Sequence, residues 1–243
     1  MAQGFFKHIP NIAYDFKSDG KYYLAKDLFR KVSTWSYLQE GVTGYNYYRI
    51  TEGERPDVVA AKLYGDSTLY WTFFLVNENL QDFNDWPKSS QYFEKFLVRK
   101  YSGKCLVAGS STDIVSSTSK FRLGEKVSQT SSGAYGFITE VNPTHNRITL
   151  NSISGEFTTG TISADRAPEA DKICTITSIQ NERDATNHYT DSNGFKTTVS
   201  TGNTVVTNEK YELDLNEDKF VIRYIEPRYI GKVIKEFIEI VRD

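Results

Sequence analysis

Residues 45–80 constrain the fold most strongly, because they predict a strand, a helix, a tight turn and a second helix. The first six of them, YNYYRI, are rich in the aromatic and branched side chains that suit a half-buried strand. Pro56 stands where the first turn of a helix tolerates proline, and apolar residues then recur at helical spacing. Gly65 supplies a left-handed stop, and Asp66 or Ser67 can cap the second helix.

The second predicted helix has almost no polar face. Residues 69–76 read LYWTFFLV, so a helix in this segment is apolar on nearly every side. Such a helix needs cover all round, either from its own domain or from a partner protein. The sequence leaves both alternatives open.

This segment resembles a LysM module, in which a strand is followed by two short helices. It is more similar to the LysM-like core of the baseplate wedge subunit of contractile-tailed, T-even-type bacteriophages. The motifs that recur in that family stand here as Arg55-Pro56, Ala60, Tyr64-Gly65, Leu69-Tyr70-Trp71 and Asn77-Glu78-Asn79. The resemblance implies a wedge protein with a LysM-like fold in this region.

Segments on both sides extend the resemblance. An N-terminal arm, residues 1–44, contains the string DLFRKV, which is similar to a segment near the start of the wedge proteins. A helix predicted over residues 91–100, capped by one of the two preceding serines, follows the family order. Near the C-terminus, a strand at residues 220–225 and a helix from Pro227 with a wide apolar stripe match the way the family ends.

Residues 105–206 differ from the rest in composition. They are poor in aromatic residues and rich in Ser, Thr and Gly, with short alternating runs separated by turn residues. This pattern predicts a small antiparallel barrel or sandwich, inserted into the wedge-protein framework. Within it, residues 181–203 are expected to form a hairpin or an exposed loop around Asp191-Ser192-Asn193-Gly194.

The predicted fold class is therefore α+β. It consists of a LysM-like βααβ core with its following helix at residues 45–104, the N-terminal arm, the inserted all-β domain, and a strand and amphipathic helix at residues 207–243 that complete the core.

Composition and charge exclude several classes of function. Lys and Arg number 29 and Asp and Glu 31, a net charge of −2, so we expect no nucleic-acid partner, because affinity for nucleic acid depends on concentrated positive charge. The start shows no signal-peptide pattern, and no window approaches the roughly 20 apolar residues of a membrane span. We therefore expect no membrane association and assembly in the host cytoplasm. Cys105 and Cys174 are expected to be reduced.

The residue types that carry out catalysis are scattered. His8, His145 and His188 lie in separate segments without metal-ligand spacing, and each is expected to be a solvated loop residue. Paired carboxylates fall in predicted turns, where solvation explains them, and no glycine loop follows a strand and opens a helix. We therefore expect a non-enzyme that has no cofactor and no metal.

The resemblance implies a structural component of a phage tail baseplate, located in the virion. Such a wedge subunit binds other baseplate wedge proteins, including neighbouring wedges and the sheath-proximal wedge subunit, and helps to join wedges around the central hub. Aromatic side chains dominate the energetics of such interfaces. The candidate interface residues are Phe5, Phe6, Phe29, Tyr70, Trp71, Phe74, Trp86, Tyr229, Ile230, Val233 and Phe237.

The alternative is a LysM-type module that binds peptidoglycan or chitin oligomers. Its sugar site would use the loops at residues 51–55 and 80–83, with Tyr and Trp rings stacking on acetamido sugars.

Overall fold

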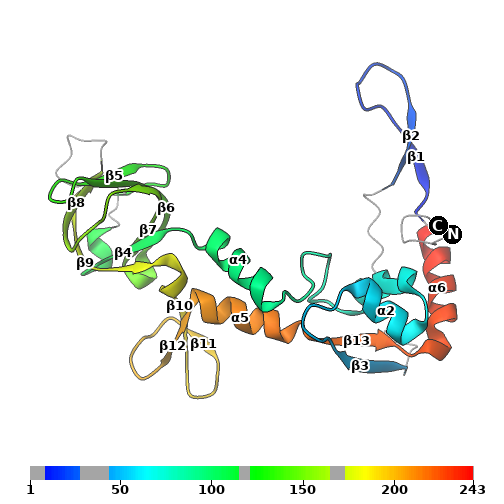
Figure 1. The fold of residues 1–243 in the computed structure, drawn as a ribbon. Helices are drawn as coiled ribbons and strands as arrows, with labels where there is room; N and C mark the ends of the chain where they lie inside the picture. Colours follow the sequence, from blue (N-terminus) through cyan, green and yellow to red (C-terminus); the bar gives the residue numbers. More distant parts are fainter. Residues whose placement is uncertain (1–8, 28–43, 115–120, 165–172, 243) are drawn as a thin grey trace. The chain divides into compact units, whose positions relative to one another are not determined.

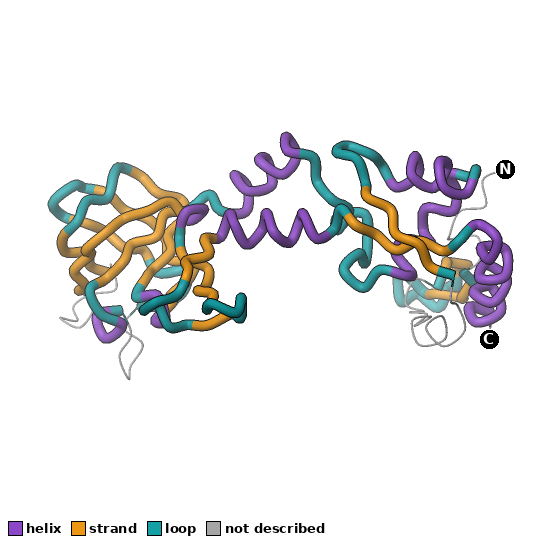
Figure 2. Tube along the Cα trace, turned by 90° about the horizontal axis from the view of Figure 1, so that it is seen from below, coloured by secondary structure: helices purple, strands orange, loops and turns teal. Residues whose placement is uncertain are grey.

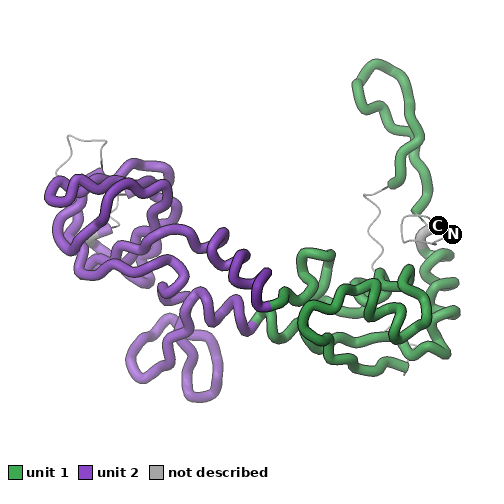
Figure 3. Tube along the Cα trace, viewed as in Figure 1, with its two compact units in different colours: residues 1–89, 215–243 green, residues 90–214 purple. Residues whose placement is uncertain are grey.

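The computed structural model describes residues 9–27, 44–114, 121–164 and 173–242 (Figure 1). The chain divides into two compact units, drawn in different colours in Figure 3: unit 1 is residues 1–89 and 215–243, and unit 2 is residues 90–214. Helices and strands both contribute (Figure 2), so the α+β class is confirmed. The inserted domain predicted at residues 105–206 falls within unit 2.

Unit 1 combines two small antiparallel sheets with helices. Its elements are β1 (Asn11–Tyr14), β2 (Tyr23–Lys26), β3 (Tyr45–Arg49), α2 (Pro56–Tyr64), the 3-10 helix η2 (Ser67–Tyr70), α3 (Trp71–Val76), β13 (Val221–Ile225) and α6 (Pro227–Arg242). β1 pairs with β2, and β3 pairs with β13. The β1–β2 hairpin lies in the segment predicted only as an arm, so this hairpin was missed by the sequence analysis.

Local sequence explains the ends of the helices in unit 1. Pro56 occupies the first turn of α2, and Gly65 ends it in the left-handed conformation with φ of 73°. The side chain of Asp66 then accepts a hydrogen bond from the backbone N–H of Thr68 and caps η2. The predicted stop and cap are therefore confirmed.

The LysM-like βααβ order is not confirmed. β3 and two helical segments follow each other as predicted, but the strand that pairs with β3 is β13, which comes after unit 2 in the sequence. One face of this sheet packs on α2, where Ile222 and Val59 are fully buried. On the other face, Ile225 packs with Val76 of α3 and Val233 of α6. Two distant parts of the chain thus share one core.

Unit 2 contains a closed barrel, a second small sheet and two helices. Its elements are α4 (Ser90–Lys100), β4 (Lys104–Ala108), η3 (Ser111–Asp113), β5 (Lys126–Gln129), β6 (Ala134–Asn142), η4 (Pro143–His145), β7 (Arg147–Ser154), β8 (Gly160–Ala164), β9 (Ile173–Asn181), η6 (Glu182–Asp184), β10 (Thr186–Thr190), β11 (Lys196–Thr197), β12 (Thr204–Thr207) and α5 (Asn208–Asp218). The last residues of α5 belong to unit 1.

The barrel closes in the order β4-β7-β6-β5-β8-β9 (Figure 1). Alternate residues of its strands fill the interior, among them Leu106, Ile148 and Ile176. The prediction of a small antiparallel barrel is confirmed. β10 and β11 form the predicted hairpin, whose turn is held by the Asp191 side chain accepting from the backbone N–H groups of Asn193 and Phe195.

Ion pairs hold the helices of unit 2. Arg183 of η6 donates to Glu94 of α4 through both terminal nitrogens and to Glu209 of α5 through Nε and Nη2. Glu212 of α5 accepts from Lys100 Nζ at 2.6 Å and from Tyr101 Oη at 2.8 Å. No helix was predicted for the residues of α5. They alternate acidic and apolar side chains and therefore show no clear helical stripe.

Candidate interaction surface

The hydrogen-bond register of the β3–β13 sheet determines which backbone groups remain available at its edges. Ile50 N donates to Phe220 O, and Glu226 N donates to Gly44 O, at the two ends of the ladder. Because bonded pairs alternate in an antiparallel ladder, the peptide groups of Tyr45, Tyr47 and Arg49 point away from β13. Those of Val221, Arg223 and Ile225 point away from β3 in the same way.

The outer edge of β13 is covered by side chains. Arg223 N donates to Asn77 Oδ1 at 2.8 Å, and Asn77 Nδ2 donates to Arg223 O at 2.9 Å. Ile225 N donates to Tyr64 Oη at 3.2 Å. Burial raises the pKa of Tyr64 to about 12, so its hydroxyl stays protonated at neutral pH. β13 therefore has no edge open to another strand at these residues.

The outer edge of β3 is open. Among the described residues, the backbone groups of Tyr47 and Arg49 have no hydrogen-bond partner. The Tyr47 side chain is 69% exposed, and Arg49 is exposed as well. Edge strands of this kind are ready templates for pairing with another chain.

A groove of about 480 Å³ lies on the face of the sheet that carries Tyr47, Val221 and Arg223. Its other wall is the segment from Val76 to Asn79, which contains the Asn-x-Asn motif. The side chain of Asn77 is used internally, whereas Glu78 and Asn79 are exposed. The groove therefore combines apolar, amide and charged groups on one face of the sheet.

The candidate interface residues named from the sequence fall into three groups. Phe5, Phe6 and Phe29 lie outside the described residues. Trp71, Trp86, Val233 and Phe237 are buried within unit 1, and Tyr70, Phe74, Tyr229 and Ile230 are half-buried. The rings of Trp71 and Phe237 lie 4.7 Å apart, so α3 and α6 cover each other. That these residues contact another protein stays a prediction.

Glu54, in one of the two loops named for the sugar-binding alternative, is engaged internally. Glu54 accepts from Tyr48 Oη at 3.0 Å and from Thr51 N at 2.8 Å, and it pairs with Lys62. Burial would raise the pKa of Glu54, but Lys62 and these hydrogen bonds hold it below its ordinary value. Trp86 Nε1 donates to Glu54 O at 2.7 Å, and the Trp86 ring is buried.

The β1–β2 hairpin exposes a cluster of large apolar side chains that the sequence analysis did not name as contacts. They are Tyr14, Phe16, Tyr22, Tyr23 and Leu24, between 47% and 80% exposed. The turn is ordered by Asp15, whose carboxylate accepts from the backbone N–H groups of Lys17 and Gly20. The SDG turn between the short runs IAYDF and YYLA is the signal that could have identified this hairpin.

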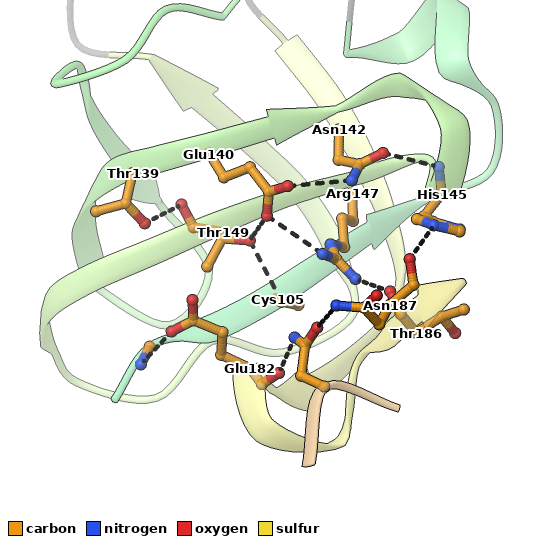
Figure 4. Close-up of polar contacts among 12 residues, drawn as sticks. Cys105, Thr139, Glu140, Asn142, His145, Arg147, Thr149, Glu182, Thr186 and Asn187 are labelled. Carbon is orange, nitrogen blue, oxygen red and sulfur yellow. Dashed lines mark hydrogen bonds and ion pairs between the residues drawn. The ribbon is translucent and has the colours of Figure 1, made fainter. Parts of the chain in front are cut away.

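Unit 2 contains a buried polar network at one end of the barrel (Figure 4). Arg147 of β7 donates to Glu140 of β6 and to the backbone carbonyl of Thr186 of β10. Glu140 also accepts from Thr149 and from Asn142. The network thereby ties two barrel strands to the second sheet.

The charges in this network stabilise each other. Burial would raise the pKa of Glu140, but the Arg147 guanidinium and the bonds from Asn142 and Thr149 hold it below its ordinary value. Burial raises the pKa of the nearby Cys105 thiol, which contacts Thr149 Oγ1 at 3.4 Å. A fully buried thiol with a raised pKa is a poor nucleophile, so we interpret the network as structural.

Two of the predictions for histidine are corrected. His145 is not a solvated loop residue: its Nε2 hydrogen-bonds the carbonyl oxygen of Asn187 at 3.2 Å (Figure 4), and burial lowers its pKa. His188 lies in β10, with Nδ1 2.9 Å from Asn187 Oδ1, and burial and the charge of Lys196 lower its pKa. His8 lies outside the described residues.

Metal clusters and membrane-spanning helices are both absent from the part of the chain that the structure describes. The described residues contain no group of three or more His, Cys, Asp or Glu side chains arranged to hold a metal ion. Among the helices described, none has the length and apolar character required to cross a membrane.

The N-terminal part of the chain is similar to known proteins. Residues 1–115 match the family described as base plate wedge protein 53. Over 77 residues the chain is 29% identical to the baseplate wedge protein gp53 of Enterobacteria phage T4, a match that covers 31% of this chain and 38% of that protein. The matched family segment contains β1 to β4, including the open edge of β3. The predicted resemblance to the baseplate wedge protein family is thus confirmed for residues 1–115, which make up less than half of this chain.

Proposed function

We propose that this chain is a structural component of a phage tail baseplate, a wedge subunit that binds neighbouring wedge proteins and helps to join wedges around the central hub. The observation that carries this proposal is the match of residues 1–115 to the base plate wedge protein 53 family. Partners would be other wedge proteins, including the sheath-proximal wedge subunit. The chain would assemble in the host cytoplasm and act in the virion without catalysis.

Surface chemistry supports the proposal. The exposed rings of Tyr22 and Tyr23 and the exposed Leu24 concentrate apolar area on a two-stranded hairpin. A two-stranded hairpin is marginally stable by itself, so a partner that covers these rings would stabilise both the contact and the hairpin. Aromatic residues are enriched in the energetically dominant parts of protein interfaces.

The sugar-binding alternative gains no support from Glu54 or from the ring of Trp86. Glu54 and the indole N–H of Trp86 bind other groups of unit 1, and the Trp86 ring is buried. A sugar that stacked on this ring would have to displace Phe73 or Phe74, whose rings lie about 6 Å away (6.0 and 6.1 Å).

Reconstitution tests the proposal. The full chain is co-expressed with the other baseplate wedge proteins of the same phage, and we expect it to co-purify with them in a defined stoichiometry. Electron microscopy of particles made without the chain should show separate wedges instead of closed baseplates. Retention on cell-wall sacculi, together with failure to bind any wedge protein, would overturn the proposal in favour of the sugar-binding module.

A paired variant tests the contribution of the hairpin. Tyr22→Ser combined with Leu24→Ser should weaken co-purification, because both side chains are exposed and apolar. The matched control is Val199→Ser combined with Val205→Ser, which removes exposed apolar side chains from unit 2. Equal loss of binding in both variants would exclude the hairpin as a specific contact.

A further inference from the structure

The two edges of the β3–β13 sheet differ in whether their outward backbone groups are hydrogen-bonded. On β13, Asn77 and Tyr64 occupy the outward backbone groups of Arg223 and Ile225. On β3, within the described part of the chain, nothing occupies those of Tyr47 and Arg49. One edge is therefore closed by two buried or half-buried polar side chains, and the other is left as a template.

Two of the features by which proteins guard an exposed edge are missing from β3. The five residues Tyr45–Arg49 contain no proline, and the register with β13 is continuous, without a bulge. Prolines, bulges and inward-pointing charges are the common devices that prevent unwanted pairing. The unguarded edge carries an exposed tyrosine, which would gain a cross-strand neighbour on pairing.

We propose that the open edge of β3 receives an extended segment of another baseplate protein as an added strand, with an acidic side chain of that segment beside Arg49. The occupant is identified by its chemistry, a polypeptide in extended conformation that supplies backbone hydrogen bonds and negative charge. This inference rests on the proposed function for the existence of such a partner.

The positive charge of Arg49 indicates that the added strand carries an acidic side chain. Arg49 makes no ion pair among the described residues, and its side chain stands on the same face of the sheet as Arg223. The one acidic residue that lines the adjacent groove is Glu78. An acidic side chain placed opposite Arg49 gains a favourable cross-strand pair. A second copy of this chain would instead bring its own Arg49 and Arg223 to this face of the sheet. Repulsion between like charges therefore disfavours self-pairing.

Residue-resolved hydrogen exchange provides the direct test. In the free chain, the amides of Asn46 and Tyr48 bond to β13 and should exchange slowly, whereas those of Tyr47 and Arg49 should exchange fast. In the wedge assembled from the full-length proteins, we expect the Tyr47 and Arg49 amides to become slow as well, by about tenfold or more for one new hydrogen bond each. If the Tyr47 and Arg49 amides still exchange fast in the assembled wedge while those of Asn46 and Tyr48 exchange slowly, the proposal is overturned.

Two variants test the backbone and the charge separately. Tyr47→Pro removes an outward N–H and leaves the donors that bond to β13, because proline is tolerated on the solvent side of an edge strand. Arg49→Glu reverses the charge without changing the backbone. Each should lower the affinity of the full chain for the other wedge proteins by about tenfold. Arg99→Glu, an exposed charge reversal on α4, is the control and should leave affinity unchanged.

The outcomes separate this inference from the proposed function. If the chain binds no wedge protein, both fail. A second outcome is that the chain binds the wedge proteins, that Arg49→Glu binds them as tightly as Arg99→Glu, and that the Tyr47 and Arg49 amides still exchange fast in the assembled wedge. In that case the edge proposal fails and the proposed function stands. Protection of these amides in the chain alone at high concentration would identify a second copy as the occupant and would also overturn the proposal.

Discussion

The side-chain amide of Asn77 makes with the peptide group of Arg223 the same two hydrogen bonds that a neighbouring strand would make. Its nitrogen donates to the Arg223 carbonyl at 2.9 Å, and its oxygen accepts from the Arg223 N–H at 2.8 Å. The same nitrogen also donates to Phe73 O at 2.8 Å, at the end of α3. Asn77 therefore joins α3 to β13 and closes that edge of the sheet.

Replacement of Asn77 should destabilise unit 1. In Asn77→Ala the part-buried hydrogen bonds to the Arg223 backbone and the buried bond to Phe73 O are lost, at a cost of about 2 kcal/mol. Urea unfolding followed by tryptophan fluorescence measures this cost for unit 1, because all three tryptophans lie within residues 1–89. Asn79→Ala, at an exposed position two residues away, is the control. Equal midpoints for the two variants would contradict the role assigned to Asn77.

Truncation of Phe237 should also lower the stability of unit 1. Its ring is 2% exposed and lies 4.7 Å from that of Trp71. Phe237→Ala leaves a cavity in this contact, and we expect a loss of about 3 to 4 kcal/mol in the free energy of unfolding. Ile240→Ala removes a partly exposed side chain from the same helix and should cost far less. A Phe237→Ala chain as stable as Ile240→Ala would show that α6 does not cover α3.

The stability of unit 2 should depend on pH through Glu140. Its folded pKa lies below the ordinary value, so its contribution is fully present above the unfolded pKa of about 4.3 and is lost as pH falls through the folded pKa. Glu140→Gln should lower stability at neutral pH by about 1 kcal/mol, allowing for the partial exposure of the carboxylate, and should flatten the acid dependence.

Calorimetry measures this effect. The transition of unit 2 is the one without a change in tryptophan fluorescence, because unit 2 contains no tryptophan. Glu156→Gln, an exposed residue of the same unit, is the matched control. An acid dependence that is the same in Glu140→Gln as in the unchanged chain would contradict the interpretation of the Arg147–Glu140 pair.

Both thiols should be unreactive in the folded chain. The side chains of Cys105 and Cys174 are buried, at 0% and 2% exposure, and burial raises the pKa of Cys105. A thiol reagent such as a disulfide of nitrobenzoate should therefore titrate two groups only after denaturation. Rapid modification of either cysteine in the native chain would show that the barrel opens, because Cys174 belongs to its interior.

Several elements follow from local sequence because their causes are local. Gly65 adopts the left-handed conformation and Asp66 caps the next helix, whatever the rest of the chain does. The alternating strands and their turns in unit 2 likewise predict a small antiparallel barrel. The β1–β2 hairpin and α5 were missed, since neither has a regular apolar period along its residues.

Only part of the candidate surface could be predicted from the sequence. A high content of aromatic residues suggested a partner, but the aromatic residues of α3 and α6 largely cover each other, as Trp71 and Phe237 do. Burial depends on which elements meet, and apolar character alone does not determine it. Exposed rings lie instead on the β1–β2 hairpin, at Tyr47 and at scattered positions such as Phe83 and Tyr92.

The sequence by itself determined the helix stops and caps, the resemblance of residues 1–115 to the wedge proteins, and the prediction of a small antiparallel barrel or sandwich, because motifs and periodicity act over short distances. The tertiary structure decided that β3 pairs with β13 and that Asn77 covers one edge of their sheet while the other stays open. Pairing joins residues more than 170 positions apart, such as Tyr47 and Arg223, and no local signal specifies a partner at that separation.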